Sequence, residues 1–231
     1  MITIRINLVE NFSFIQINMN EFARIIESCT TIVPNNIFEI GSLNGNDAVF
    51  LCEFFSIDRK NVFVFEPHPV YNKNIKKKYS EINVFDYAIG DKDEDGVPFH
   101  AIRTDIKQNQ GVSSLLSRND NREYDITIVE KKRFDSVFNE LTSEIDVLKI
   151  DVEGVSYEVL SGFGNKLRNV KIIHIECEHK EIWKGQKLYS DCERFLINNG
   201  FTMIELKIIW PQSDSVWINP VYLKKKWWEN L

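Results

Sequence analysis

The amino-acid sequence predicts a doubly wound α/β fold, in which a Rossmann-like and mainly parallel sheet is covered by helices on both faces. Three observations support this prediction. Short runs of β-branched and aromatic residues recur along the 231-residue chain, helical segments separate most of them, and the last two runs are close enough to form an antiparallel hairpin. Seven such runs predict a seven-stranded sheet with an antiparallel last strand.

The first five runs are expected to be parallel strands. Each is nearly continuous in apolar residues, which is typical of strands that are buried on both faces. Right-handed crossovers would connect them across the sheet. The runs cover residues 37–41, 62–66, 83–89, 147–151 and 170–176.

Helices are predicted between these strands. In residues 47–55, apolar side chains recur at positions i, i+3, i+4 and i+7, which places them on one face of a helix. Residues 156–160 and 188–197 are further predicted helices. Gly162 and Gly200 follow them and are suited to ending a helix.

Two regions depart from the alternation of strand and helix. Residues 90–144 are too long for one crossover, so we expect an insertion with its own short strands and a mobile loop. Residues 201–207 and 216–223 are predicted strands joined through residues 211–214 as a hairpin. No linker or repeat interrupts the chain, and a single domain over its whole length is expected.

The composition and charge of the chain argue against several classes of function. The net charge of −6 argues against a nucleic-acid partner, because clustered positive charge supplies most of the affinity for nucleic acids. No apolar stretch approaches the ~20 residues that span a membrane, and the first residues lack a secretory signal. The four cysteines show no metal-binding spacing, which favours a reducing compartment. We therefore expect a soluble, cytoplasmic protein that acts on a small molecule, either as a monomer or as an oligomer.

A glycine turn follows the first predicted strand. Residues 39–47 read Glu-Ile-Gly-Ser-Leu-Asn-Gly-Asn-Asp, so that the pattern is E-x-G-x-x-x-G. Glycines let the backbone turn tightly and approach a ligand at a helix N-terminus. The pattern has one glycine fewer than the dinucleotide-binding fingerprint, and Glu39 suits a ligand with a cationic amine. An ordinary strand-to-helix turn is the alternative interpretation.

Carboxylates end two other predicted strands. Glu66 follows the second strand, where a carboxylate can accept both hydroxyls of a ribose; a solvated side chain is the alternative. Asp151 and Glu153 follow the fourth strand, in a position that suits a base or a metal ligand. Glu153 could equally cap the next helix. Lys149 lies within the same apolar strand and needs a charged partner there.

Five motifs of this sequence resemble the FkbM family of O-methyltransferases. The run 148–154, Leu-Lys-Ile-Asp-Val-Glu-Gly, is the most specific of them. The others are the turn at residues 39–45, Val64-Phe65-Glu66-Pro67, Ala88-Ile89-Gly90-Asp91 and Gly111-Val112-Ser113-Ser114-Leu115. The resemblance extends from about residue 37 to residue 176. It implies a class I methyltransferase fold with a reversed last strand and S-adenosylmethionine as the cofactor.

The resemblance also implies which residues bind the cofactor. Glu39 and the turn Gly41, Ser42, Asn44 and Gly45 would hold its methionine part, Glu66 its ribose, and Asp86, Tyr87 and Ala88 would lie near the adenine. Asp47 and Pro67 adjoin these motifs and complete the set, and Asp151 would lie beside the sulfonium. The acid near the adenine is either Asp86 or Asp91.

A methyltransferase must align its acceptor and help to remove the acceptor's proton. The candidate catalytic residues are Asp151, Glu153, Glu176 and His174. The flanking residues Ile173 and Ile175 give His174 an alternative role as a core residue. A divalent cation such as Mg²⁺, held by the carboxylates, is a second route to an activated acceptor. The family resemblance implies a hydroxyl of a sugar, glycolipid or secondary metabolite as the acceptor.

Three other functions remain open from the sequence. An NAD(P)-dependent oxidoreductase of sugar nucleotides shares the sheet but would have a third glycine in the turn. A methyltransferase of nucleic-acid bases would carry an Asn/Asp-Pro-Pro-aromatic run after the fourth strand, where this chain has Asp151-Val152-Glu153-Gly154. A non-catalytic cofactor-binding module could keep the same fold.

Overall fold

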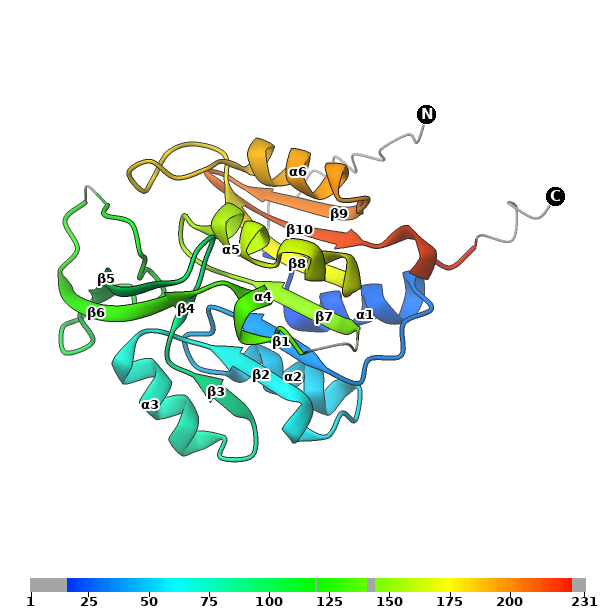
Figure 1. Cartoon of the computed structure of the whole chain (residues 1–231), viewed down its shortest axis with the longest axis horizontal. Helices are drawn as coiled ribbons and strands as arrows, with labels where there is room; N and C mark the ends of the chain where they lie inside the picture. The colour runs from blue at the N-terminus through cyan, green and yellow to red at the C-terminus, as the bar shows by residue number, and fades with distance from the viewer. Residues whose placement is uncertain (1–15, 119, 141–143, 226–231) are drawn as a thin grey trace.

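The computed structural model describes residues 16–118, 120–140 and 144–225. The first residues, on which the absence of a secretory signal was predicted, lie outside this part. A seven-stranded sheet has the order β3-β2-β1-β7-β8-β10-β9 (Figure 1). Its strands are β1 (Ile37–Ile40), β2 (Val62–Phe65), β3 (Asn83–Phe85), β7 (Ile145–Ile150), β8 (Val170–Glu178), β9 (Thr202–Ile209) and β10 (Gln212–Ile218).

The first five strands of that order are parallel, and β10 is antiparallel to both of its neighbours, β8 and β9. The last strand of the chain is therefore reversed and inserted inside the sheet. This arrangement confirms the predicted fold class. It also brings the first residues of β10 to the edge where the parallel strands end.

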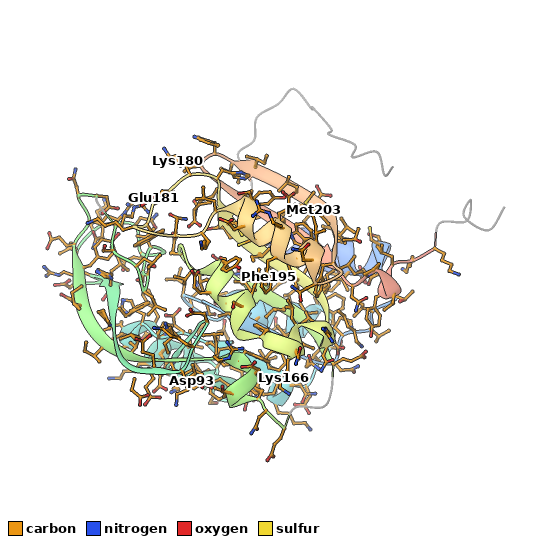
Figure 2. The ribbon with its side chains drawn as sticks, turned by 45° about the horizontal axis from the view of Figure 1, so that its top comes forward. Asp93, Lys166, Lys180, Glu181, Phe195 and Met203 are labelled. Atoms are coloured by element: carbon orange, nitrogen blue, oxygen red, sulfur yellow. The ribbon has the colours of Figure 1, made fainter. Side chains whose placement is uncertain are left out.

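Alternating apolar residues of the strands build two cores, one on each face of the sheet. Helices α1 (Met19–Cys29), α2 (Asn46–Phe54) and α3 (Pro69–Lys78) contribute to the core that includes Val147. Helices α5 (Ser156–Gly162) and α6 (Tyr189–Asn198), together with the short α4 (Phe134–Val137), contribute to the core that includes Leu148. Phe195 of α6 and Met203 of β9 pack against this second core (Figure 2). The sheet is thus covered on both faces, as a doubly wound fold requires.

The third predicted strand is divided in the structure. After β3 the chain leaves the main sheet, and β4 (Ala88–Ile89) pairs with β6 (Tyr124–Lys132) instead. The carbonyl of Phe85 accepts the backbone N–H of Glu66 at 3.0 Å and the side-chain amide of Asn72 at 2.9 Å. These bonds hold the end of β3 beside α3, while the chain beyond it turns toward β6. The prediction of one continuous strand over residues 83–89 was wrong.

The hairpin is also tighter than predicted. β9 and β10 are joined at Trp210 and Pro211, and β10 begins at Gln212, whereas the sequence predicted a loop over residues 211–214. Two polar side chains at the start of this strand find partners inside the protein, since Gln212 donates to Glu176 at 2.6 Å and Asp214 accepts from the backbone of Ile17 at 2.8 Å. The polar sequence here can form a buried strand because its amide and carboxylate side chains are hydrogen-bonded.

Residues 90–144 contain β5 (Glu94–Ile102) and β6, which form an antiparallel pair that projects from the main sheet (Figure 1). The segment between them folds back, because Ser114 bridges to His100 of β5. The single-domain organisation and the mobile loop stay predictions. No helix within the described residues has both the length and the apolar character needed to cross a membrane.

Candidate functional site

The register of the parallel strands aligns four chemically important positions. Phe65 of β2, Ile40 of β1, Ile150 of β7 and Ile175 of β8 are neighbours across the sheet. The residue that follows each of them therefore emerges at the same edge. These residues are Glu66, Gly41, Asp151 and Glu176. Ligands of doubly wound folds bind at this carboxyl edge.

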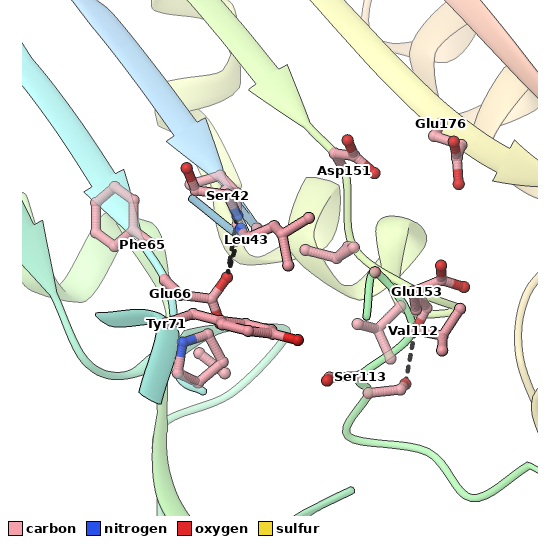
Figure 3. A pocket seen from close by; sticks show the side chains of 18 of the residues that line it. Ser42, Leu43, Phe65, Glu66, Tyr71, Val112, Ser113, Asp151, Glu153 and Glu176 are labelled. Carbon is pink, nitrogen blue, oxygen red and sulfur yellow. Dashed lines mark hydrogen bonds between the residues drawn. The ribbon is translucent and has the colours of Figure 1, made fainter. Parts of the chain in front are cut away.

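A cavity of about 440 Å³ lies beyond this edge (Figure 3). Its volume is within the range of small-molecule sites. The β1–α2 turn, the start of α3 and the β7–α5 connection line it, and residues 109–115 of the insertion contribute a further wall. Predicted site residues on its lining are Gly41, Ser42, Asn44, Asp47, Glu66, Pro67, Tyr87, Ala88, Asp151, Glu153 and Glu176.

The glycine turn brings β1 close to the end of β7. Gly41 has a φ of +78°, and a Cβ at this position would lie 2.1 Å from the carbonyl oxygen of Asp151. Any side chain there would separate the two strand ends. The absence of a side chain thus lets the backbone of the turn and Asp151 border one cavity.

Glu66 bonds the end of β2 to this turn. One carboxylate oxygen accepts the backbone N–H of Leu43 at 2.9 Å and that of Ser42 at 3.2 Å, and the other accepts the N–H of His68 at 2.8 Å. Burial raises the pKa of Glu66, and these backbone donors oppose the rise. The carboxylate is therefore held in place at the cavity wall, as Figure 3 shows.

Lys149 is surrounded by carboxylates from three elements. Its ammonium lies 2.7 Å from Asp151, 3.0 Å from Asp47 and 3.3 Å from Glu39. These partners raise the pKa of Lys149 despite its burial, and the lysine in turn holds the pKa of Asp151 below its usual value although burial acts to raise it. Burial raises the pKa of Glu39 to about 7. The sequence predicted that Lys149 needs a charged partner, and three carboxylates pair with it.

Two further carboxylates, Glu153 and Glu176, have raised pKa values, in contrast to Asp151. Burial and the nearby charges of Glu178 and Asp151 raise the pKa of Glu153 to about 8. Burial and the same kind of repulsion raise the pKa of Glu176 well above its usual value. Both residues line the cavity beside Asp151 (Figure 3), so acids with low and high proton affinity lie side by side.

Four predicted residues lie away from the cavity lining. His174 is buried against Phe22 of α1, and burial lowers its pKa to about 3. Asp86 is exposed and pairs with Lys76 at 3.7 Å. Glu39 and Gly45 lie behind the lining, although Glu39 accepts a hydrogen bond from the Ser42 hydroxyl at 2.5 Å.

The sequence interpretation missed several lining residues. Tyr71 follows the Glu66–Pro67 motif by one helical turn, and this spacing was the available signal. Gln16 and Gln212 both donate to the Glu176 carboxylate, at 2.8 and 2.6 Å, but they come from distant parts of the chain. Only tertiary structure brings these amides together.

The described residues contain no group of three or more His, Cys, Asp or Glu arranged to hold a metal ion. The magnesium ion predicted as an alternative therefore has no support from the arrangement of these side chains. The carboxylates near Asp151 are instead occupied with Lys149, Gln16, Gln212 and backbone or indole N–H groups.

Among the solved structures compared, one with a TM-score above 0.5 supports the fold. Methyltransferase FkbM from Methylobacillus flagellatus superposes with a TM-score of 0.54 at 12% identity; the match covers 80% of this chain and 44% of that one. A putative rRNA-methylase from Clostridium thermocellum gives 0.49 at 9% identity, with 88% and 96% covered. Magnesium protoporphyrin IX methyltransferase from Synechocystis, solved with bound SAM, gives 0.46 at 8% identity, with 85% and 74% covered.

A search of curated protein sequences finds no match. The family comparison is decisive, because residues 39–203 match the methyltransferase FkbM domain. This range includes the glycine turn, Glu66 and the carboxylates that follow β7. The chain belongs to the FkbM methyltransferase family.

Proposed function

We propose that this protein binds S-adenosylmethionine and transfers its methyl group to a hydroxyl of a sugar, glycolipid or secondary metabolite. One observation carries the proposal. A single cavity joins the glycine turn and Glu66 to Asp151, Glu153 and Glu176, so that a nucleoside-binding edge and a set of proton acceptors face the same space. Membership of the FkbM family supports methyl transfer over nicotinamide chemistry.

The residues on the β1 and β2 side fit the cofactor. Glu66 offers a buried carboxylate to ribose hydroxyls, and the turn presents backbone that approaches the ligand closely. Asp47, Glu66 and Asp151 line the cavity with the single ammonium of Lys149, which leaves this half of the cavity with excess negative charge. A ligand that carries both a sulfonium and an ammonium matches that charge.

The residues on the β7 and β8 side fit the acceptor. Bound S-adenosylmethionine would supply an activated methyl group, and the chain would supply proton transfer and alignment. A general base works best when its pKa lies near the operating pH, so Glu153 suits this role better than Asp151. Oε1 of Glu153, which has no hydrogen-bond partner among the described residues, would take the proton of the acceptor hydroxyl, while Asp151 remains ionised beside Lys149.

The charges of the lining also restrict the acceptor. Lys149 is the only cation among the described lining residues, and its charge is already shared by three carboxylates. The lining includes the amides of Gln16, Asn109, Gln110 and Gln212, which can bind hydroxyl groups. We therefore propose an acceptor without a phosphate or carboxylate near the reacting hydroxyl.

Calorimetric titration with S-adenosylmethionine, S-adenosylhomocysteine and NAD tests the cofactor. We expect micromolar binding of the first two and none of NAD. Transfer of a labelled methyl group to a panel of methyl glycosides, with and without Mg²⁺, then tests the acceptor. Binding of NAD alone would overturn the proposed function, and cofactor binding without transfer to any hydroxyl would limit the protein to a binding module.

A further inference from the structure

Trp183 contacts the carboxylate that we assign as the base. It lies after β8, it is completely buried, and its indole N–H donates to Oε2 of Glu153 at 3.0 Å. Among the described residues, this is the only hydrogen bond to the Glu153 carboxylate. We propose that Trp183 is a positioning residue, which holds Oε2 of Glu153 so that Oε1 faces the acceptor. The inference rests on the proposed role of Glu153.

A glycine makes room for the indole. Gly154 has a φ of +75°, and a Cβ there would lie 2.6 Å from Cδ1 of Trp183. The indole therefore lies directly against the backbone that carries Glu153. The glycine that ends the most specific motif of the sequence is required by this contact, because no larger residue leaves space for the ring.

Other contacts fix the plane of the indole. The guanidinium of Arg118 lies 5.3 Å from the centre of its ring, and Tyr124 approaches edge-on at 6.4 Å. The backbone N–H of Trp183 donates to Oε1 of Gln186 at 2.5 Å. A side chain held on its ring and on its backbone can position another group with little further loss of entropy.

Trp183 also connects Glu153 to the insertion. Its backbone bridges to Arg118, and the hydroxyl of Ser114 donates to the carbonyl oxygen of Glu153 at 2.6 Å. Glu153 is thus held at its carboxylate by one segment and at its backbone by another. Ser114 lines the cavity, whereas Trp183 lies outside the lining. The orientation of the base therefore depends on the insertion and on the segment after β8 as well as on β7.

The pKa of Glu153 depends on its burial, on the charges around it and on the hydrogen bond from the Trp183 indole. Burial disfavours the ionised carboxylate most, the charges of Glu178, Asp151 and Glu176 add to this effect, and Arg118 from the insertion opposes it. The hydrogen bond from Trp183 also favours the ionised form and lowers the pKa of Glu153. Without that N–H, Glu153 would keep its proton to a higher pH.

Nuclear magnetic resonance of the tryptophan indole groups tests this directly and needs no acceptor. In the unaltered protein, the Trp183 indole resonance, identified by its proximity to Gly154, should shift with pH with a midpoint near 8. Glu153→Gln should abolish that shift. A resonance that stays constant with pH in the unaltered protein would overturn the positioning role, whatever the cofactor does.

A matched pair of variants extends the test to catalysis. Trp183→Phe keeps an aromatic ring but removes the N–H, and it should raise the pH midpoint of methyl transfer by about one unit, as expected for a hydrogen bond to a charged group. Trp217→Phe is the control, because Trp217 is equally buried and donates to Ser215 at 2.9 Å outside the cavity lining. It should leave the midpoint unchanged.

The outcomes separate the two proposals. If Glu153→Gln abolishes transfer but Trp183→Phe leaves the midpoint unchanged, the positioning role is wrong and the base is retained. If Glu153→Gln retains full activity, the assignment of the base fails. If Trp183→Phe does not fold, the indole titration in the unaltered protein and in Glu153→Gln still decides the inference.

Discussion

Glu39 and Lys149 lie directly opposite each other on β1 and β7 and form a buried ion pair at 3.3 Å. The pair joins two central strands immediately below the cavity. Because Asp47 and Asp151 also contact Lys149, removal of the ammonium would leave three acids near one another without a counter-charge.

Lys149→Met should therefore destabilise the protein by about 3–5 kcal/mol, as is usual when one partner of a buried ion pair is removed. Urea unfolding, followed by circular dichroism, measures this. Lys60→Met is the matched control, since Lys60 pairs with Asp58 at 2.8 Å on the surface and should show no measurable change. Equal stability of the two variants would contradict this prediction. It would mean that one of the three acids takes up a proton when the ammonium is removed, which relieves the repulsion between them.

Glu66→Ala should weaken S-adenosylmethionine binding about 100-fold and leave the fold intact. The reason is the loss of a buried acceptor for ribose hydroxyls, together with the bonds to Ser42 and Leu43 that shape the turn. Calorimetry gives the affinity and circular dichroism reports the fold. Glu81→Ala, at an exposed residue paired with Arg59, serves as the control. Unchanged affinity in Glu66→Ala would refute the ribose assignment.

Asp151→Asn should lower the turnover number about 100-fold while changing cofactor affinity only a few-fold. The substitution keeps the shape of the side chain but removes a negative charge from the cavity lining, where electrostatic stabilisation would act on the reacting groups. Single-turnover transfer to an active glycoside, compared with calorimetric affinity, separates the two effects. A variant as fast as the unaltered protein would remove Asp151 from the mechanism.

The free energy of unfolding should fall between pH 5 and pH 8. Burial raises the pKa of Glu178 from its usual 4.5 to about 7, so the folded protein binds more protons than the unfolded chain in this interval. Glu178→Gln should reduce the loss of stability by about 2 kcal/mol, because the amide can still accept the Gly154 N–H. Thermal unfolding at both pH values checks this, with the exposed Glu181→Gln as the control. Identical pH dependence in both variants would contradict the prediction.

Acceptors that carry a phosphate should be poor substrates. The described cavity lining pairs its single lysine with carboxylates, so an added negative charge meets repulsion. A methyl glycoside should have a kcat/KM at least roughly tenfold above that of its phosphorylated counterpart. Comparable values for the two would mean that the acceptor's charge lies outside the cavity.

The sequence was sufficient to predict the elements whose structure is determined by neighbouring residues. The apolar runs at β1, β2, β7 and β8 and the residues that end them could be predicted, because strand burial and glycine turns leave clear patterns. Glu66 and Asp151 were placed at the cavity edge for the same reason. Their roles in binding and catalysis stay predictions.

The remaining contacts of the site could not be predicted, because they join residues that are far apart in the sequence. Nothing near Gln212 in the sequence indicates that it meets Gln16 at Glu176, so a buried polar strand was interpreted as a loop. Trp183 lies thirty residues from Glu153, and no local pattern connects them. Such contacts depend on how separate segments fold over one another, which a period of two or 3.6 residues does not encode.

Because β10 runs in the reverse direction, the sheet contributes residues to the cavity in two ways. Its first residue, Gln212, reaches the cavity from a two-residue turn at the molecule's surface, whereas Glu66, Gly41 and Asp151 follow strands in the middle. Exchange of the turn and its neighbours can alter one wall without shifting the strands that carry the other residues. A substitution in this hairpin can therefore change the shape and polarity of one side of the cavity while the ends of the parallel strands stay in place.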